Sequence, residues 1–315
     1  MAKKEISTFL SADGKTQIHV AAWLPENKKP TAVLQLVHGM VEYIERYEPF
    51  ADYLTEQGFA VIGHDHIGHG ASVEDPSRWG IMEGKHPSDI MVEDMYQNYC
   101  RIRKAYPDLP HFILGHSMGS YMLRKFLAVK ADDLADCSGA IIMGTGSESS
   151  LKIKMGKLVL HVMAALHSWE YKSEFVAGLM YGAPYREFDT TGKEPEKSWL
   201  TRDVDIVKSY YKDPACSFLF SLSGFKALLE ATSFDNRQEN MNRMRKELPV
   251  FFVSGDRDPV GNLGKGVREA YEKFRAAGLS DVSLKLYPED RHEILNELDR
   301  EQVYEDLCRW MSERI

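Results

Sequence analysis

The chain has 315 residues, of which 43% are hydrophobic, 11% aromatic and 27% charged. These fractions are ordinary for a globular protein and exclude collagen-like, low-complexity and disordered chains. The 39 Lys and Arg against 47 Asp and Glu give a net charge of −8 without a dense basic run, so we expect no binding to nucleic acid. The length fits two domains or one α/β domain with an insertion.

Cysteine usage and hydropathy bear on the compartment. The four cysteines are scattered and form no C-x-x-C pair, which predicts neither a disulfide scaffold nor a zinc site. No stretch approaches the ~18 apolar residues that a membrane span needs, and no signal peptide is visible. We therefore expect a cytoplasmic protein with reduced thiols and without a transmembrane segment.

An alternation of strands and helices follows an early hairpin. Residues 1–25 alternate apolar and polar positions around Asp13-Gly14, which predicts a β-hairpin. Continuous apolar runs typical of buried parallel strands follow at 32–37, 59–63, 112–114, 140–143, 250–253 and 282–287. Helical patterns lie at 47–57, 90–105, 118–129 and 267–277. The alternation predicts an α/β fold with a mostly parallel, doubly wound sheet.

Residues 147–240 interrupt this alternation. They contain no strand-like run but show helical stretches at 158–166 and 221–231. We interpret them as a helical cap (lid) on a core formed by residues 1–146 and 241–315. Substrate-binding residues are expected within this cap. Its apolar side chains predict an acyl-binding tunnel, a lipid-touching face or simple cap packing. They are Leu158, Val162, Met163, Trp169, Phe175, Leu179, Met180, Phe218 and Phe220.

The segment Gly115-His116-Ser117-Met118-Gly119 lies between a strand-like run and a helix. In a nucleophile elbow the serine occupies a strained strand-to-helix turn, and the flanking glycines are needed because a Cβ would clash with neighbouring elements. The pattern alone is also compatible with a tight glycine turn and an idle serine. The strand before it and the helix after it favour Ser117 as a nucleophile.

A serine nucleophile needs a histidine base and a carboxylate that orients it. Asp258 follows the run 250–253, and His292 follows the run 282–287. The order Ser117, Asp258, His292 is the one expected in α/β-hydrolases. Asp256 is the alternative acid, with Asp258 then a turn residue.

Acyl transfer also requires backbone N–H groups that stabilise the developing oxyanion. The first is expected from Met118, the residue after the nucleophile. The second is expected from Met40 in His38-Gly39-Met40, directly after the run 32–37, where Gly39 lets the backbone turn closely.

A histidine-rich stretch offers a metal-binding alternative. His64, Asp65, His66 and His69 could be metal ligands. They follow a buried strand, where Asp and His side chains often hydrogen-bond to local backbone, so we predict no metal site.

Four segments together carry a family resemblance. They are His38-Gly39-Met40 with Glu42, Arg46 and Tyr47; His64 to Gly70 with Ser72; the Gly115 to Gly119 elbow; and Arg291 to Glu297. In this combination the chain resembles the monoacylglycerol lipase and lysophospholipase-like branch of the serine α/β-hydrolases. It departs from the animal monoacylglycerol lipases at Met40-Val41-Glu42-Tyr43, where those enzymes commonly have small residues and a histidine.

The resemblance implies a carboxylic ester hydrolase with the triad Ser117, Asp258 and His292 and the oxyanion donors Met40 and Met118. It implies no metal and no cofactor. The leading hypothesis is hydrolysis of monoacylglycerol, lysophospholipid or similar small esters through an acyl-enzyme, with peripheral lipid contact through the cap.

Two other functions remain open. A peptidase or amidase of the same fold would use acidic cap residues to hold a substrate amine. The candidates are Glu148, Glu170, Glu174, Glu187 and Glu194. A non-catalytic ligand-binding protein would keep the fold without turnover, which the complete triad disfavours.

Overall fold

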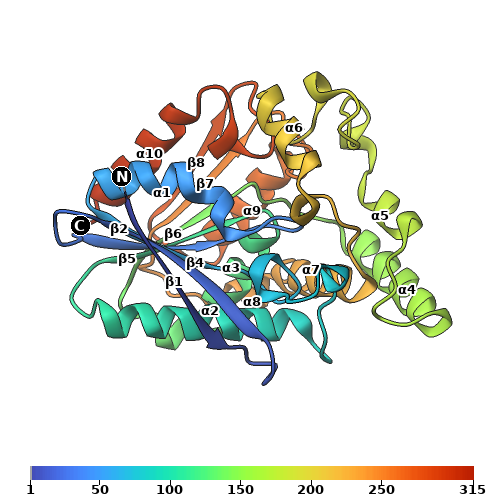
Figure 1. Cartoon of the computed structure of the whole chain (residues 1–315), viewed down its shortest axis with the longest axis horizontal. Coiled ribbons are helices and arrows are strands. Elements are labelled where there is room, and N and C mark those ends of the chain that lie inside the picture. Colours follow the sequence, from blue (N-terminus) through green and yellow to red (C-terminus); the bar gives the residue numbers. More distant parts are fainter. Residues whose placement is uncertain (1) are drawn as a thin grey trace.

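An eight-stranded sheet forms the centre of the computed structural model, which describes residues 2–315 (Figure 1). The strand order is β1-β2-β4-β3-β5-β6-β7-β8. The strands are β1 (Ala2–Leu10), β2 (Gln17–Pro25), β3 (Ala32–Val37), β4 (Phe59–His64), β5 (His111–His116), β6 (Cys137–Met143), β7 (Val250–Gly255) and β8 (Val282–Tyr287). The strands from β3 to β8 pair in parallel, whereas β1 and β2 are antiparallel to their neighbours. The predicted α/β fold with a mostly parallel sheet is therefore confirmed.

The predicted hairpin forms the antiparallel edge. β1 and β2 pair along their full lengths, from Ala2 opposite Pro25 to Leu10 opposite Gln17. In the turn, Asp13 Oδ1 accepts hydrogen bonds of 2.8 Å from the N–H groups of Lys15 and Thr16. An aspartate that caps its own turn in this way is a local reason for the chain to reverse here.

Helices cover both faces of the sheet. They are α1 (Glu48–Glu56), α2 (Pro87–Ala105), α3 (Met118–Val129), α4 (Ser150–Leu166), α5 (Glu174–Met180), α6 (Val204–Lys212), α7 (Leu222–Asp235), α8 (Gln238–Met241), α9 (Lys265–Ala276) and α10 (Arg300–Ser312). Short 3₁₀ helices are η1 (Ile44–Tyr47), η2 (Gly70–Ser72), η3 (Pro76–Arg78), η4 (Ala131–Asp133), η5 (Ala183–Tyr185), η6 (Pro195–Lys197), η7 (Pro214–Cys216) and η8 (Ile294–Asn296).

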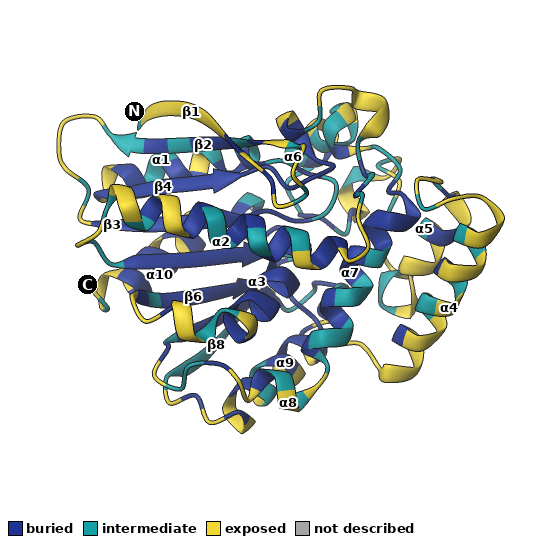
Figure 2. Ribbon diagram, turned by 90° about the horizontal axis from the view of Figure 1, so that it is seen from below, coloured by how far each residue is buried: buried dark blue, intermediate teal, exposed yellow. Residues whose placement is uncertain are grey.

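Two apolar clusters fill the space between sheet and helices. One contains residues of α2, α3, α7 and α9, and the other contains residues of α1 and α10. Every residue of β3, β4, β5 and β7 is buried, which explains the continuous apolar runs in these segments (Figure 2). The carboxyl ends of β3 and β5 are adjacent because these two strands pair directly. The loops that follow these two strands therefore meet at the edge of the sheet where open α/β folds bind ligands.

Residues 147–240 contain helices and no extended strand among the described residues, only the isolated bridges Lys172 to Ser221 and Asp189 to Ser198. α4 and α5 lie at the periphery of the molecule and are largely exposed (Figures 1 and 2). α7 instead packs against α2 and α3 as well as α4. No helix within residues 2–315 has both the length and the apolarity required to cross a membrane.

Candidate active site

Ser117 occupies a strained turn between β5 and α3. Its φ of 52° and ψ of −121° lie in a region of backbone conformation that residues other than glycine rarely adopt. A methyl group on Gly119 would lie 2.2 Å from the carbonyl oxygen of Val37, and one on Gly115 would lie 2.5 Å from the carbonyl oxygen of Gly119. Both glycines are thus required by close backbone packing, as an elbow geometry demands.

The structure brings His292 and Asp258 together. His292 Nδ1 lies 3.1 Å from Asp258 Oδ2, and both side chains are buried. The carboxylate also accepts hydrogen bonds from Ser254 Oγ at 3.1 Å and from the N–H of Val260 at 2.8 Å. Asp256, the alternative acid, instead accepts the N–H of Glu289 at 2.8 Å. With Nδ1 donating to Asp258, Nε2 of His292 is left with the lone pair that a general base needs.

The elbow and the histidine loop meet at Gly144. The ring of His116, the neighbour of Ser117, lies 4.7 Å from the ring of His292. A methyl group on Gly144 would lie 3.2 Å from His292 Cε1 and 3.1 Å from His116 Cδ2. No hydrogen bond joins Ser117 Oγ to His292 in the part of the chain that the structure describes. Contacts of this kind commonly tighten when a hydrolase binds its substrate.

The turn after β3 lies against Ser117. A methyl group on Gly39 would lie 2.9 Å from Ser117 Cβ, so this backbone approaches the elbow as closely as a glycine allows. Within residues 2–315 neither the Met40 N–H nor the Met118 N–H has a hydrogen-bond acceptor. Both predicted oxyanion donors are therefore unpaired at the adjacent ends of β3 and β5.

A buried network of charges lies behind these loops. Glu42 Oε1 accepts the N–H of Gly39 at 2.5 Å and lies 3.1 Å from His116 Nδ1. Arg46 bridges Glu42 Oε2 at 3.1 Å and both oxygens of Glu293 at 2.8 Å. The network ties the turn after β3, the elbow and the loop of His292 together. In the sequence, Glu42, Arg46 and Glu293 were noted only as part of the family resemblance. The i, i+4 spacing of Glu42 and Arg46 is nevertheless a signal for an ion pair.

The pKa values in this network follow from its pairing. Burial alone would raise the pKa of Glu42 and Glu293, but the opposite charges outweigh it. His116 and Arg46 lower the pKa of Glu42, and Arg46 lowers that of Glu293 to about 2. Burial likewise opposes the charged form of His116, yet its hydrogen bond to Glu42 raises its pKa. The network therefore sets the two carboxylates against Arg46 and against His116, whose pKa is raised.

The histidine-rich stretch hydrogen-bonds to the turn after β3. His38 Nδ1 donates to the carbonyl oxygen of Gly39 at 2.8 Å, and His66 Nε2 donates to that of His38 at 3.1 Å. His69 Nε2 accepts the N–H of Val41 at 3.3 Å. Burial lowers the pKa of each of these three imidazoles, to about 4 for His69. They are therefore neutral near pH 7 and bind local backbone.

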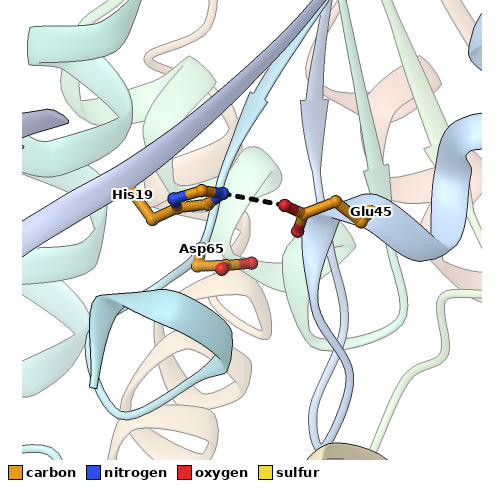
Figure 3. A group of neighbouring side chains, drawn as sticks. All are labelled: His19, Glu45 and Asp65. Carbon is orange, nitrogen blue, oxygen red and sulfur yellow. Dashed lines mark hydrogen bonds and ion pairs between the residues drawn. The ribbon is translucent and has the colours of Figure 1, made fainter. Parts of the chain in front are cut away.

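Asp65 belongs to a second group near this turn. Its two oxygens accept the N–H groups of Ile44 at 2.7 Å and Ala71 at 2.8 Å. Burial raises its pKa to about 7 although these bonds oppose the rise. Side-chain ligand atoms of His19, Glu45 and Asp65 all lie within 4.8 Å of one another, and His19 donates to Glu45 at 2.9 Å (Figure 3). Because backbone donors already use both Asp65 oxygens, we assign this group a role in holding the loops.

The cap contacts the histidine loop directly. The indole of Trp199 stacks on the His292 ring at 5.1 Å, and the Trp199 carbonyl accepts the His292 N–H at 3.4 Å. The Leu200 carbonyl accepts the N–H of Glu293 at 2.7 Å, and Arg291 donates to the carbonyl oxygens of Ser198 and Thr201. No sequence pattern identified Trp199, because its stacking partner His292 lies far away in the sequence and its other contact is made by its backbone carbonyl.

The apolar cap residues divide into two groups. Leu158, Val162, Phe175, Leu179 and Met180 are exposed on α4 and α5. The others are partly or fully buried: Met163, Trp169, Phe218 and Phe220.

Comparisons with known proteins bear on this site. The family described as serine aminopeptidase, S33, matches residues 28–299. The chain is 27% identical to the monoglyceride lipase of Mus musculus, over 99% of this chain and 92% of the relative. It is 25% identical to an uncharacterized abhydrolase domain-containing protein of Dictyostelium discoideum, covering 98% of this chain but only 29% of that protein.

Among solved structures, a thermostable carboxyl esterase from Bacillus coagulans in complex with glycerol is 29% identical. It superimposes with a TM-score of 0.87 over 99% of both chains. The resemblance to the monoacylglycerol lipase branch that the sequence motifs indicated is confirmed by these relatives. The chain belongs to the serine aminopeptidase, S33, family and has the α/β-hydrolase fold.

Proposed function

We propose that this protein is a serine hydrolase that cleaves carboxylic esters of mono-acyl lipids, such as monoacylglycerol or lysophospholipid, or similar small esters. The observation that carries the proposal is the convergence of a strained Ser117 elbow and a buried His292–Asp258 pair beside two unpaired backbone N–H groups. Relatives named monoglyceride lipase and carboxyl esterase support an ester substrate.

The mechanism follows from the roles of these atoms. Ser117 Oγ attacks the ester carbonyl while His292 Nε2 takes its proton, and Asp258 keeps the imidazole in the required tautomer. The N–H groups of Met40 and Met118 stabilise the tetrahedral oxyanion. His292 then protonates the leaving alcohol, and water activated by His292 hydrolyses the acyl-enzyme. No cofactor takes part in these steps.

The cap, residues 147–240, is proposed to bind the acyl chain and to contact lipid. Its buried apolar residues belong to the larger apolar cluster of the core, whereas the exposed ones lie on α4 and α5. The exposed ones include Leu158, 66% exposed, and Leu179, 55% exposed. Exposed apolar side chains that gather on one part of a surface are typical of interaction sites.

This lipid contact predicts greater activity on micellar than on monomeric substrate. Leu158→Ser with Leu179→Ser should remove that difference and leave hydrolysis of p-nitrophenyl acetate unchanged. Equal wild-type activity on micellar and monomeric substrate would contradict the contact.

An aminopeptidase is the second candidate, since the matching family carries that description. An exposed carboxylate binds an amine only weakly, because solvent and salt screen the pair. Glu148, Glu187 and Glu194 are exposed and paired with Lys152, Arg257 and Lys197, respectively. Glu170 and Glu174 are exposed as well. These environments favour the esterase.

The decisive experiment compares p-nitrophenyl esters from acetate to palmitate, monoacylglycerol, lysophospholipid and amino-acid p-nitroanilides. The matched pair of variants is Ser117→Ala and Ser120→Ala, because Ser120 lies one turn further along and donates to the Ser117 carbonyl at 2.6 Å. We expect ester turnover that falls at least 10³-fold in Ser117→Ala and less than tenfold in Ser120→Ala.

The outcome also separates the alternatives. Faster anilide than ester turnover would establish the peptidase, and ligand binding without any turnover would establish the non-catalytic alternative. A cytoplasmic location is proposed with this function, supported by four cysteines that are all free thiols. Fractionation that places the protein outside the cytoplasm would contradict it.

A further inference from the structure

Two of the four polar groups around the Met40 N–H are fixed by side chains of distant segments, the third by Glu42 of the same turn and the fourth by His38. The Gly39 N–H donates to Glu42 at 2.5 Å, and the Val41 N–H donates to His69 at 3.3 Å. The Val41 carbonyl accepts from Tyr210 Oη at 3.1 Å. The Gly39 carbonyl accepts from His38 Nδ1 at 2.8 Å.

The Gly39 carbonyl and the Met40 N–H belong to the same peptide group. In a planar trans peptide these two bonds point in opposite directions, so a donor that fixes the carbonyl also fixes the N–H. This matters at Gly39, because a residue without Cβ permits both orientations of the following peptide. Close packing forces glycine here, since a methyl group would lie 2.9 Å from Ser117 Cβ. The peptide that follows Gly39, next to the nucleophile, is therefore the one whose orientation most needs a hydrogen bond to fix it.

We propose that His38 is a positioning residue that locks the Gly39–Met40 peptide, so that the Met40 N–H faces the oxyanion. The inference rests on the proposed function and extends it by one residue. Within residues 2–315 the His38 ring makes no hydrogen bond to Ser117, and its proposed effect is transmitted through the carbonyl of Gly39.

The surrounding hydrogen bonds dictate the tautomer that this lock needs. A carbonyl oxygen only accepts, so Nδ1 of His38 must carry the proton. The N–H of His66 only donates, at 3.0 Å, so Nε2 of His38 must carry the lone pair. Both ring nitrogens are thus satisfied in one neutral tautomer.

The charges near His38 leave this tautomer undisturbed. Burial, together with the neighbouring His66 and His69, holds the pKa of His38 well below its usual range. The nearest carboxylate oxygen, Asp65 Oδ1, lies 3.8 Å from Nε2 and already accepts the N–H of Ile44. A proton on Nε2 would instead face the backbone N–H of His66, so protonation of His38 would break this hydrogen bond.

Two amide substitutions distinguish loss of the hydrogen bond to the Gly39 carbonyl from loss of side-chain packing. In His38→Asn the side-chain amide reaches the place of Nδ1 and keeps a donor for the Gly39 carbonyl. In His38→Gln the amide reaches the place of Nε2, which keeps an acceptor for His66 but removes the lock. His64→Gln is the control, because the His64 ring is buried beside His66 and, within residues 2–315, hydrogen-bonds only with Asn98.

The measurements are kcat and KM for an ester, the inhibition constant of an alkyl boronic acid, and the thermal midpoint. We expect His38→Gln to lose about 10²-fold in kcat with KM changed less than threefold, as for loss of one oxyanion donor. Boronate affinity should fall in parallel, because the boronate imitates the tetrahedral oxyanion. His38→Asn should recover at least tenfold of the lost kcat, and His64→Gln should lower kcat less than threefold.

Equal kcat in the two His38 variants, or a Gln variant more active than the Asn variant, would overturn the proposal. So would unchanged boronate affinity in His38→Gln. Failure of the underlying function is recognised separately, since Ser117→Ala would then retain the wild-type ester turnover.

Discussion

Removing the positive charge of Arg46 should uncover how strongly the buried network stabilises the fold. Arg46→Met keeps an apolar stem in place of the arginine stem but leaves the carboxylates of Glu42 and Glu293 without their shared partner. The pKa of Glu293 lies at about 2 instead of its ordinary 4.5, mainly because Arg46 outweighs the effect of burial. At about 1.4 kcal/mol per pH unit, this difference corresponds to about 3 kcal/mol. Removing one partner of a buried ion pair costs a similar ~3–5 kcal/mol.

The pH dependence gives this prediction a sign. The lowered pKa means that Glu293 stabilises the wild type fully above pH 4.5 and loses this contribution as pH falls from 4.5 toward 2. Without Arg46, burial raises the pKa of Glu293, so the folded variant binds a proton before the unfolded chain does. The difference in unfolding free energy between wild type and variant should therefore shrink as pH falls from 7 to 5.

Urea unfolding followed by tryptophan fluorescence at pH 7 and pH 5 measures both quantities. Arg275→Met is the control, because Arg275 is 58% exposed and lies 3.9 Å from Glu272, itself 63% exposed. Exposed pairs contribute less than about 1 kcal/mol. The reasoning is refuted if Arg46→Met costs no more than this control at pH 7, or if its cost is the same at both pH values.

Two further predictions concern His111 and Gly119. His111 is fully buried, and burial followed by the charge of Arg103 lowers its pKa to about 3. The unfolded chain therefore gains about 2 kcal/mol from protonating this side chain between pH 7.5 and pH 5, where the folded state stays neutral. His111→Phe should remove this loss of unfolding free energy at low pH. In urea unfolding, the variant should therefore become about 2 kcal/mol more stable relative to wild type as pH falls from 7.5 to 5. A difference in unfolding free energy that does not change with pH would contradict this reasoning. Gly119→Ala should abolish ester turnover and lower the thermal midpoint, since its methyl group would lie 2.2 Å from the Val37 carbonyl oxygen. The control is Gly178→Ala in α5, where the added methyl group meets no atom within 4 Å and should stabilise the helix by about 0.5–1 kcal/mol. Similar thermal shifts in both variants would argue against the close packing at Gly119.

The parallel strands and the elbow helix were the most predictable parts of the fold. The bounds expected for the segments now seen as β3, α3 and β8 agree with the structure to the residue. Strands buried on both faces leave continuous apolar runs, and glycine spacing marks the elbow, so both signals are local. β5 extends beyond its expected range because His111 and His116 are polar residues in a buried strand.

α10 was not predicted, although Val303, Leu307 and Met311 are buried at helical spacing. The charged residues between them lower the apolar signal of this segment. The helix is held by packing on the sheet, which a local pattern does not reveal.

The predicted site residues lie together, while the side chains that hold them were missed. Arg46 and Glu293 are 247 positions apart, so their pairing leaves no trace in local sequence. Trp199 contacts the His292 loop through a backbone carbonyl, which any residue would supply, and through a ring stack with a residue far away in the sequence. Long-range pairs and backbone acceptors are the two kinds of contact that sequence spacing cannot predict.

The attachment of the cap to the His292 loop limits how this protein can be recombined with its relatives. Arg202 pairs with Asp290, Glu297 and Asp299, so residues 198–202 hold the loop by side chains as well as backbone. A chimera that exchanges all of residues 147–240 would replace one wall of the histidine loop together with the outer helices. An exchange limited to α4 and α5 would leave that wall intact. Crossover points for testing the proposed role of the cap therefore belong before residue 198, and the segment that follows should be inherited together with Ser117, Asp258 and His292.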